Sequence, residues 1–282
     1  MTWRALAPAK INRELRVGRI RPDGFHEVRS RMVAIDLADR LSAGPGESLE
    51  FSCDDPAVPQ GSENLVVRAA QALAKDAGIA PRARLTLEKR VPMGGGLGGG
   101  SSDAAVTLLL LDRLWKLETP IERLQNVAAG LGSDVPFFLT GGEADVSGRG
   151  EIVAPVVDSQ EAHLLLLVPP FSIPTADVYR LYAGRGTLPE HLEISSSGGR
   201  RFLGPNDLAL AVLMKEPRME AFFEAAAAVT DDWTVSGSGA TIVIHGRAAA
   251  DRLAGFGMNA RLLPCRTLSR REYMALVTPR ED

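Results

Sequence analysis

Pro92-Met93-Gly94-Gly95-Gly96-Leu97-Gly98-Gly99-Gly100-Ser101-Ser102 is the stretch that decides the fold of this chain. Backbone N–H groups in such a glycine-rich loop can approach an anion closely, because no side chains intervene. The residues that follow predict a helix over 101–116, with Ser101 or Ser102 as its N-cap. A flexible linker would be polar and repetitive, whereas alternating apolar residues flank this loop. A loop that opens a helix in this way predicts a phosphate-binding site.

Two familiar glycine motifs fit the loop poorly. The P-loop needs a lysine where Gly100 stands. The pattern G-x-G-x-x-G matches at Gly94, Gly96 and Gly99, but its acidic residue about 20 positions later should end a strand. The nearest acidic residue, Asp112, lies inside the predicted helix instead. A dinucleotide-dependent oxidoreductase therefore remains one alternative, and a catalytically inactive nucleotide-binding module remains another.

Composition narrows the class of protein. The chain has 282 residues, which favours two medium domains over one large domain. Its net charge of −3 gives no electrostatic reason to expect nucleic acid or an anionic membrane as partner. The two cysteines and four histidines show no metal-ligand spacing, so we predict no metal-binding residues. Two distant thiols and the absence of a long apolar run favour the cytoplasm.

Periodicity and turn residues predict an α+β fold in two lobes, with domains over 1–150 and 151–282. The predicted loops are a turn-rich segment over 18–26 and a surface loop over 184–201. Helices are expected from a cap at Ser62, over 101–116, from Thr119-Pro120 through 120–130, and over 206–214 and 217–229. Strands are expected over 3–17, 28–35, 48–51, 84–91, 143–157, 163–168, 234–235 and 240–244.

Three segments together resemble the motifs of the GHMP kinases, a family that phosphorylates small metabolites with ATP. They are Pro8-Ala9-Lys10-Ile11-Asn12, the glycine loop and Ser236-Gly237-Ser238-Gly239-Ala240. Two more, Arg21-Pro22-Asp23-Gly24-Phe25-His26 and Leu131-Gly132-Ser133-Asp134-Val135-Pro136-Phe137-Phe138, resemble the branch whose substrate is a cytidyl diphosphate sugar alcohol. The resemblance covers nearly the whole chain and is strongest before residue 150. It implies a two-lobed α+β fold with mixed and antiparallel sheets and an active site in the cleft between the lobes.

The same resemblance implies the catalytic residues. Asp134 matches the catalytic base and Lys10 matches its charge partner, with Asn12 as a hydrogen-bonding neighbour that contacts the substrate. Without it, Asp134 would be interpreted as a turn or helix-cap aspartate. Lys10 and Asn12 would be interpreted as ordinary polar residues of a strand.

The substrate pocket is likewise implied by the resemblance. Phe25 matches an aromatic that stacks on cytosine, His26 matches a residue that contacts the base edge, and Tyr179, which follows Thr175, matches a second stacking aromatic. Gly237, Ser238 and Gly239 would form a wall of the pocket. From the residues alone, an aromatic such as Phe25 in a loop is more often a local packing residue, and Tyr179 could equally be a core residue of an amphipathic helix. The second glycine turn could be an ordinary hairpin loop.

The implied cofactors are ATP and Mg²⁺. The whole loop from Pro92 to Ser102 would hold ATP phosphates, and Asn64 and Lys89 match positions near the adenine. Two departures from the family pattern stand out: Arg13-Glu14 replaces apolar residues, and Phe25 replaces a tyrosine. Another GHMP kinase with a different small alcohol is the alternative within the class, and the oligomeric state is left open.

Overall fold

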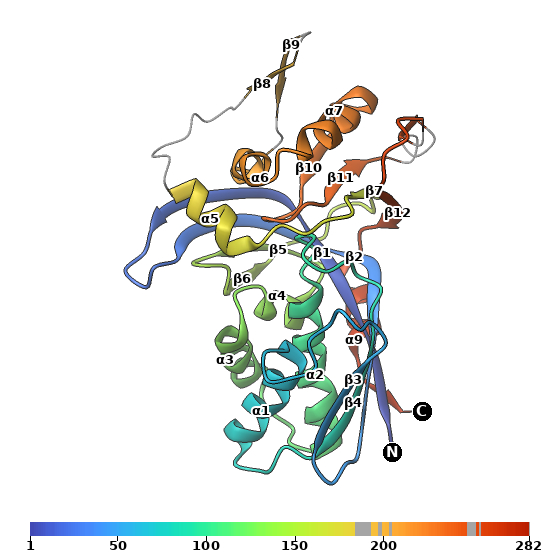
Figure 1. The fold of residues 1–282 in the computed structure, drawn as a ribbon. Helices are drawn as coiled ribbons and strands as arrows, with labels where there is room; N and C mark the ends of the chain where they lie inside the picture. The colour runs from blue at the N-terminus through green and yellow to red at the C-terminus, as the bar shows by residue number, and fades with distance from the viewer. Residues whose placement is uncertain (184–192, 197–198, 203–204, 247–251, 254, 282) are drawn as a thin grey trace.

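Two long strands run through both lobes of the molecule. The computed structural model describes residues 1–183, 193–196, 199–202, 205–246, 252–253 and 255–281. In it, β1 (Trp3–Ile20) and β2 (His26–Gly44) form one antiparallel hairpin. Ala5 and Ala7 of β1 belong to a first core, Ala9 and Ile11 to a second, and Leu15 to a third. The middle of β1 therefore lies where the lobes meet (Figure 1).

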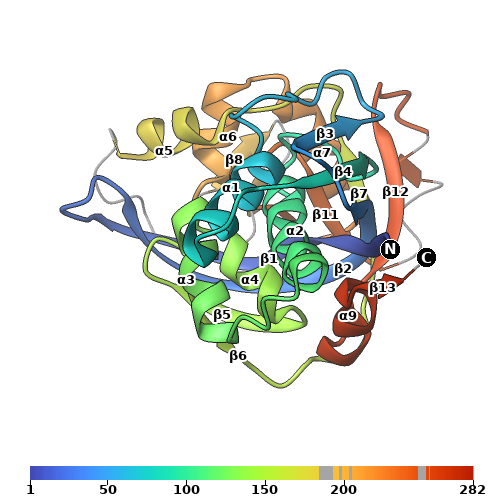
Figure 2. The same ribbon diagram turned by 90° about the horizontal axis from the view of Figure 1, so that it is seen from below.

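The first lobe is a seven-stranded sheet with helices on one face (Figures 1 and 2). Its strands follow the order β13-β1-β2-β4-β3, and β5 joins β2 and carries β6. The other strands are β3 (Leu49–Cys53), β4 (Ala83–Glu88), β5 (Glu143–Ser147), β6 (Ile152–Pro155) and β13 (Arg280–Glu281). The helices are α1 (Leu65–Ala77), α2 (Gly99–Trp115), α3 (Ile121–Leu131), α4 (Val135–Thr140) and α9 (Arg270–Val277).

The second lobe is a four-stranded antiparallel sheet of order β10-β11-β7-β12. Leu165 and Leu167 of its strand β7 pack in the core of α6 and α7, whereas Leu164 and Leu166 pack against β1 and β2. Alternation along one buried strand therefore joins the lobes. The elements are β7 (His163–Val168), α5 (Thr175–Ala183), α6 (Ala209–Lys215), α7 (Met219–Val229), β10 (Trp233–Val235), β11 (Ile242–His245) and β12 (Arg261–Arg266).

The α+β, two-lobed fold is confirmed, with several boundaries corrected. Strands β1 and β2 extend into the predicted loop 18–26, which shrinks to a turn, and 143–157 is two strands rather than one. Part of the predicted loop 184–201 forms the paired strands β8 (Glu193–Ser196) and β9 (Gly199–Phe202). The remainder, 184–192 and 197–198, lies outside the described residues. The division at residue 150 stays a prediction, and β6, α9 and β13 contribute to the first lobe.

The predicted N-caps of two helices, α1 and α2, are wrong. Helix α2 begins at Gly99 because Gly98, its N-cap, adopts a left-handed conformation with φ of 70°. Helix α1 is capped by Asn64 rather than Ser62, and the Asn64 side chain accepts a hydrogen bond from Val66 N. Asn64 is as favourable an N-cap as Ser62, whereas Gly98 caps α2 through its backbone conformation, without a side-chain hydrogen bond. Among the described helices, none has the length and apolar character needed to cross a bilayer.

Candidate active site

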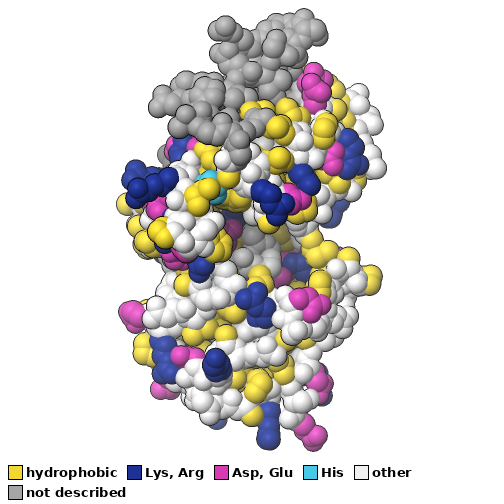
Figure 3. Space-filling view, turned by 60° about the vertical axis from the view of Figure 1, so that its left-hand side comes forward, with side chains coloured by type: hydrophobic (Ala, Val, Ile, Leu, Met, Phe, Trp, Pro, Cys, Tyr) yellow, Lys and Arg dark blue, Asp and Glu magenta, His cyan; other side chains and the backbone are white. Residues whose placement is uncertain are grey.

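A cavity of about 1060 Å³ opens between the lobes. Figure 3 shows the surface hollowed at this level, with apolar and charged side chains around the hollow. Most residues predicted to bind substrate or ATP line this cavity. They are Lys10, Asn12, Phe25, His26, Asn64, Lys89, Pro92, Met93, Gly94, Gly95, Gly96, Leu97, Gly98, Gly99, Gly100, Ser101, Asp134, Thr175, Tyr179, Gly237 and Ser238.

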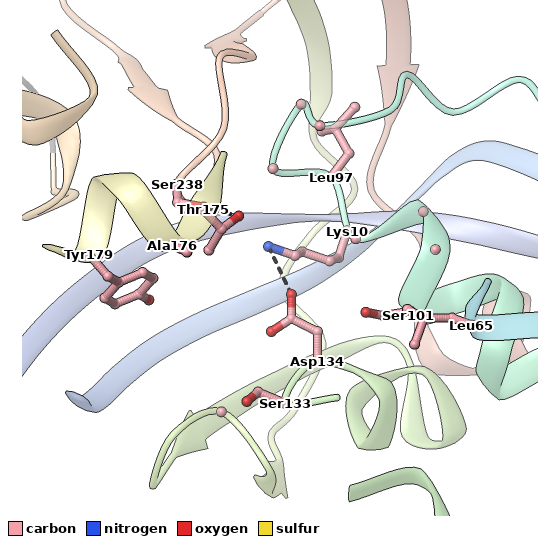
Figure 4. Close-up of a pocket in the computed structure, with 18 of the residues that line it drawn as sticks. Lys10, Leu65, Leu97, Ser101, Ser133, Asp134, Thr175, Ala176, Tyr179 and Ser238 are labelled. Atoms are coloured by element: carbon pink, nitrogen blue, oxygen red, sulfur yellow. Dashed lines mark hydrogen bonds and ion pairs between the residues drawn. The ribbon is translucent and has the colours of Figure 1, made fainter. Parts of the chain in front are cut away.

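Lys10 and Asp134 both line the cavity, and their charged groups face each other. Lys10 projects from the middle of β1, and Asp134 immediately precedes α4 (Figure 4). Lys10 Nζ lies 3.6 Å from Asp134 Oδ2. The lysine side chain is 3% exposed and the aspartate side chain 32%, so the carboxylate is the member of the pair that a substrate can reach.

A hydrogen-bond chain fixes the lysine. Lys10 Nζ donates to Asn12 Oδ1 at 2.6 Å, Asn12 Nδ2 donates to Ser30 Oγ at 2.7 Å, and Ser30 donates to the Glu14 carbonyl. The register of β1 against β2 shifts on both sides of the Lys10–Asn12 segment. Such irregularities re-aim side chains. Burial lowers the pKa of Lys10 below its ordinary value, and the Asp134 carboxylate opposes that shift.

The glycine loop approaches Lys10 through its backbone. Lys10 N donates to the Leu97 carbonyl at 2.9 Å. Gly94, Gly96 and Gly98 all have positive φ values, between 64° and 75°, which only glycine adopts without strain. A Cβ on Gly98 would lie 2.8 Å from the Phe138 ring and 3.0 Å from Lys10 Cγ. The loop therefore requires glycine both for its conformation and for its close packing.

The second glycine turn interlocks with this loop. A Cβ on Gly96 would lie 1.9 Å from the Ser236 carbonyl oxygen, and one on Gly239 would lie 2.0 Å from Gly96 N. Ser236 Oγ donates to the Gly96 carbonyl at 2.9 Å. The neighbouring Gly237 lies beside Lys10, because a Cβ there would be 3.3 Å from Lys10 Nζ. The two turns thus form one continuous backbone surface above Lys10.

Two predicted contact residues support the cavity from outside its lining. Ser102 is fully buried and its hydroxyl donates to the Pro8 carbonyl at 2.8 Å, which ties α2 to β1. Gly239 packs against the backbone of Gly95 and Gly96. The structure brings neither to the cavity surface. Asn64 does line the cavity, but its side chain caps α1 and donates to the Pro59 carbonyl at 2.6 Å.

Lys89 lies in a buried charged cluster beneath the start of α2. Its ammonium group bonds Asp39 and, at 3.0 Å, Asp103. Asp39 also accepts from the backbone N–H groups of Arg90 and Val91, at the entrance to the glycine loop. Burial raises the pKa of Asp103 to about 8, and the nearby Lys89 charge opposes that shift. The cluster connects both ends of the loop, since Val91 precedes it and Asp103 follows it.

The aromatic residues lie at the other end of the cavity. The His26 ring lies 5.8 Å from the ring of Tyr179, between centroids. His26 Nδ1 lies 2.9 Å from the Gly18 carbonyl, a contact in which Nδ1 is the donor, so Nε2 is the ring nitrogen left to contact a ligand. Ser238 Oγ donates to Thr175 Oγ1 at 2.8 Å, and this links the second glycine turn to α5. Phe25 is 49% exposed, which leaves its ring accessible to a stacking partner.

Sequence reasoning missed several residues that the structure brings to the site. Asp39, Asp103, Ser30 and Arg149 belong to no motif considered above. The signal for Arg149 was its place between Gly148 and Gly150, which predicts a tight turn. Asp39 and Ser30 carried no local signal, because their partners are distant in sequence. The Arg13-Glu14 departure leaves β1 continuous, since Arg13 pairs with Glu143 and Glu14 with Arg16.

Comparison with known proteins agrees with this geometry. Residues 64–142 match the family described as GHMP kinases N terminal domain. A homoserine kinase structure from Cytophaga hutchinsonii, at 17% identity and a TM-score of 0.66, shares the fold. It aligns over 99% of this chain and 96% of its own.

Other relatives are closer in sequence. The 4-diphosphocytidyl-2-C-methyl-D-erythritol kinase of Salinispora arenicola is 39% identical, over 90% of this chain and 87% of its own. The enzyme of that name from Salinibacter ruber is 38% identical, over 92% and 97%. A crystal structure of 4-(cytidine 5'-diphospho)-2C-methyl-D-erythritol kinase is 33% identical, with a TM-score of 0.75 over 94% of this chain and 98% of that one. The chain therefore belongs to the family of 4-diphosphocytidyl-2-C-methyl-D-erythritol kinases, within the GHMP kinases.

Proposed function

We infer that this chain transfers the γ-phosphoryl group of ATP to the 2-hydroxyl of 4-diphosphocytidyl-2-C-methyl-D-erythritol, a step of the non-mevalonate isoprenoid pathway. The observation that carries this is the order of groups along one cavity. Tyr179 lies on one side of the Lys10–Asp134 pair, and Leu97 of the glycine loop and Ser101 of α2 lie on the other side (Figure 4). Phe25 also lines the cavity.

The centre of the cavity suits phosphoryl transfer. Such a reaction needs an acceptor hydroxyl held in line and positive charge near the moving group. We propose that Asp134 accepts or orients the proton of the hydroxyl, because it is the exposed member of the pair. Lys10, held by Asn12 and Asp134, would place its charge beside the transferred group.

The ATP end of the cavity suits a polyphosphate. The N–H groups at the start of α2 and the positive end of its dipole favour phosphate. No group of three His, Cys, Asp or Glu side chains that could hold a metal occurs in the described part of the chain. Mg²⁺ prefers substrate phosphates and water with few protein ligands. We propose that Mg²⁺ enters with ATP and is held mainly by its phosphates.

The cytidine end of the cavity fits the proposed substrate. His26 presents an acceptor at Nε2, which can receive a hydrogen bond from the exocyclic amine of cytosine. Phe25 and Tyr179 offer rings for stacking. Both cysteines are free thiols, and this fits the reducing cytoplasm that we propose as the compartment.

A coupled ADP-release assay tests this function. We expect turnover with 4-diphosphocytidyl-2-C-methyl-D-erythritol and near-background rates with mevalonate, homoserine and galactose. Comparable rates with any of those three would instead support another GHMP kinase.

The dinucleotide alternative is not favoured. Strand β4 precedes the loop and β5 is the next strand after α2, and each of them pairs antiparallel with β2. In a dinucleotide site the strands before the loop and after its helix are instead parallel neighbours. In a thermal-unfolding assay we expect ATP, and not NAD, to raise Tm.

A further inference from the structure

One cation that lines the cavity makes no salt bridge with a carboxylate among the described residues, although the Asp23 carboxylate is near enough to interact with it electrostatically. Four lysines and arginines line the described cavity. Lys10 pairs with Asp134, Lys89 with Asp39 and Asp103, and Arg180 with Asp177. Arg149 forms no ion pair with any described residue, although it is partly buried. An unpaired charge that faces a cavity indicates an anionic ligand.

The turn between β5 and β6 holds Arg149 in place. Gly148 and Gly150 flank it with φ values of 73° and 122°. The Gly148 carbonyl accepts from Val28 N at 2.7 Å, and this fixes the turn against β2. Arg149 Nη2 donates to the Ala129 carbonyl at 2.7 Å. The guanidinium is therefore pre-positioned, and its remaining N–H donors have no hydrogen-bond partner among the described residues.

Arg149 spans the gap between the base end and the catalytic pair. Its guanidinium carbon lies 5.1 Å from the centroid of the Phe25 ring. The adjoining Gly150 packs beside Asp134, because a Cβ on Gly150 would lie 3.7 Å from Asp134 Oδ1. A ligand with a base at Phe25 and a hydroxyl at Asp134 must pass this arginine.

We propose that Arg149 binds the diphosphate group of the substrate and thereby sets the preference for a nucleoside diphosphate over an uncharged nucleoside. The proposal rests on the function proposed above, since that substrate has a diphosphate between its base and its alcohol. Arginine suits the role because its planar fork of donors matches two phosphate oxygens. The contact with Phe25 also couples the diphosphate contact to the ring on which the base stacks.

Calorimetry with CDP and cytidine tests the proposal without depending on turnover. We expect wild-type protein to bind CDP more tightly than cytidine. Arg149→Met should weaken CDP binding roughly 10- to 100-fold, as expected for a lost charge-assisted hydrogen bond, and should change cytidine binding less than threefold. Arg149→Lys should recover part of the CDP affinity, because it restores the charge without the fork.

Arg123→Met is the matched control. Arg123 pairs with Asp76 on the surface and does not line the cavity, so CDP and cytidine affinities should not change. In the kinase assay, Arg149→Met should raise KM for the cytidyl substrate by the same factor as the CDP affinity falls. KM for ATP should stay within threefold, and melting temperatures will show that the variants are folded.

Three results would overturn the proposal: equal affinity of the wild type for CDP and cytidine, equal loss of both in Arg149→Met, or unchanged CDP binding in that variant. If CDP binding depends on Arg149 but the cytidyl alcohol is not phosphorylated, the diphosphate site stands and the proposed function fails. If the alcohol is phosphorylated and CDP affinity does not change in Arg149→Met, the proposed function stands and this inference fails.

Discussion

Gly96→Ala should disable the ATP site through a contact with the second glycine turn. The added Cβ would lie 1.9 Å from the Ser236 carbonyl oxygen and 2.9 Å from Gly239 N. Both neighbours are backbone atoms, so no side-chain rotation relieves the clash. The loop and the turn must separate by about 1 Å or more to restore van der Waals contact. A misplacement of about 1 Å can cost a factor of about 10² in rate.

The stability cost can also be worked out. Gly96 has φ of 75°, and a non-glycine residue in that region costs roughly 1–2 kcal/mol. Overpacking adds about 1–3 kcal/mol, so we expect the free energy of unfolding to fall by roughly 2–5 kcal/mol.

Urea unfolding and titration calorimetry with a non-hydrolysable ATP analogue will measure the two effects. Gly130→Ala is the matched control, because Gly130 lies in α3 outside the cavity with nothing within 4 Å of a new Cβ. It should leave ATP affinity unchanged and stabilise the helix by up to about 1 kcal/mol. Wild-type ATP affinity in a folded Gly96→Ala protein would refute the interlocked arrangement.

Three further predictions concern the site and one surface helix. Asp134→Asn should lower kcat by about 10²–10⁴, and combining it with Lys10→Met should add little further loss in steady-state kinetics, because groups that act as a unit are non-additive. Phe25→Ala should weaken CDP binding by roughly 1–3 kcal/mol, the worth of one stacked base, with ATP affinity unchanged by calorimetry. Glu272→Gln should destabilise the protein at pH 7 but not near pH 2. Hydrogen bonds from Ser269 hold the pKa of Glu272 at about 2 in the folded protein, so its stabilisation is present above its ordinary pKa and is lost as the pH falls toward 2. Thermal melts of the wild type and of Glu272→Gln between pH 7 and pH 2 will show whether their difference in stability disappears.

Local patterns predicted most of the elements and the order of the site along the chain. Loose alternation predicted β1, a buried apolar run predicted β7, and an amphipathic run predicted α1. The start signal Thr119-Pro120 predicted α3, and helices were also expected at α6 and α7. The sequence could also place the glycine loop before a helix. These features depend on residues within a few positions of each other, and local periodicity records them directly.

Contacts between distant segments could not be predicted in this way. The partnership of Lys89 with Asp39 and Asp103 joins residues 50 and 14 positions apart. The contact of Arg149 with Phe25 joins the β5–β6 turn to the β1–β2 turn, and these two turns are far apart in the sequence. The cap of α2 was missed for a related reason, because Gly98 is packed against Phe138 and Lys10, which are distant in sequence.

Helix α9 and strand β13 belong to the first lobe although they follow the second lobe in the sequence, and this affects when the first lobe can fold during synthesis. Residues Trp3 and Arg4 pair with Glu281 and Arg280. Tyr273, fully buried, donates its hydroxyl to the Phe138 carbonyl at 2.6 Å. A chain that emerges from the ribosome N-terminus first usually folds its first domain first. Here the first lobe, which carries the ATP loop, cannot complete its core until α9 has been made. Trp3 and Arg4 are therefore translated long before the strand β13 that pairs with them.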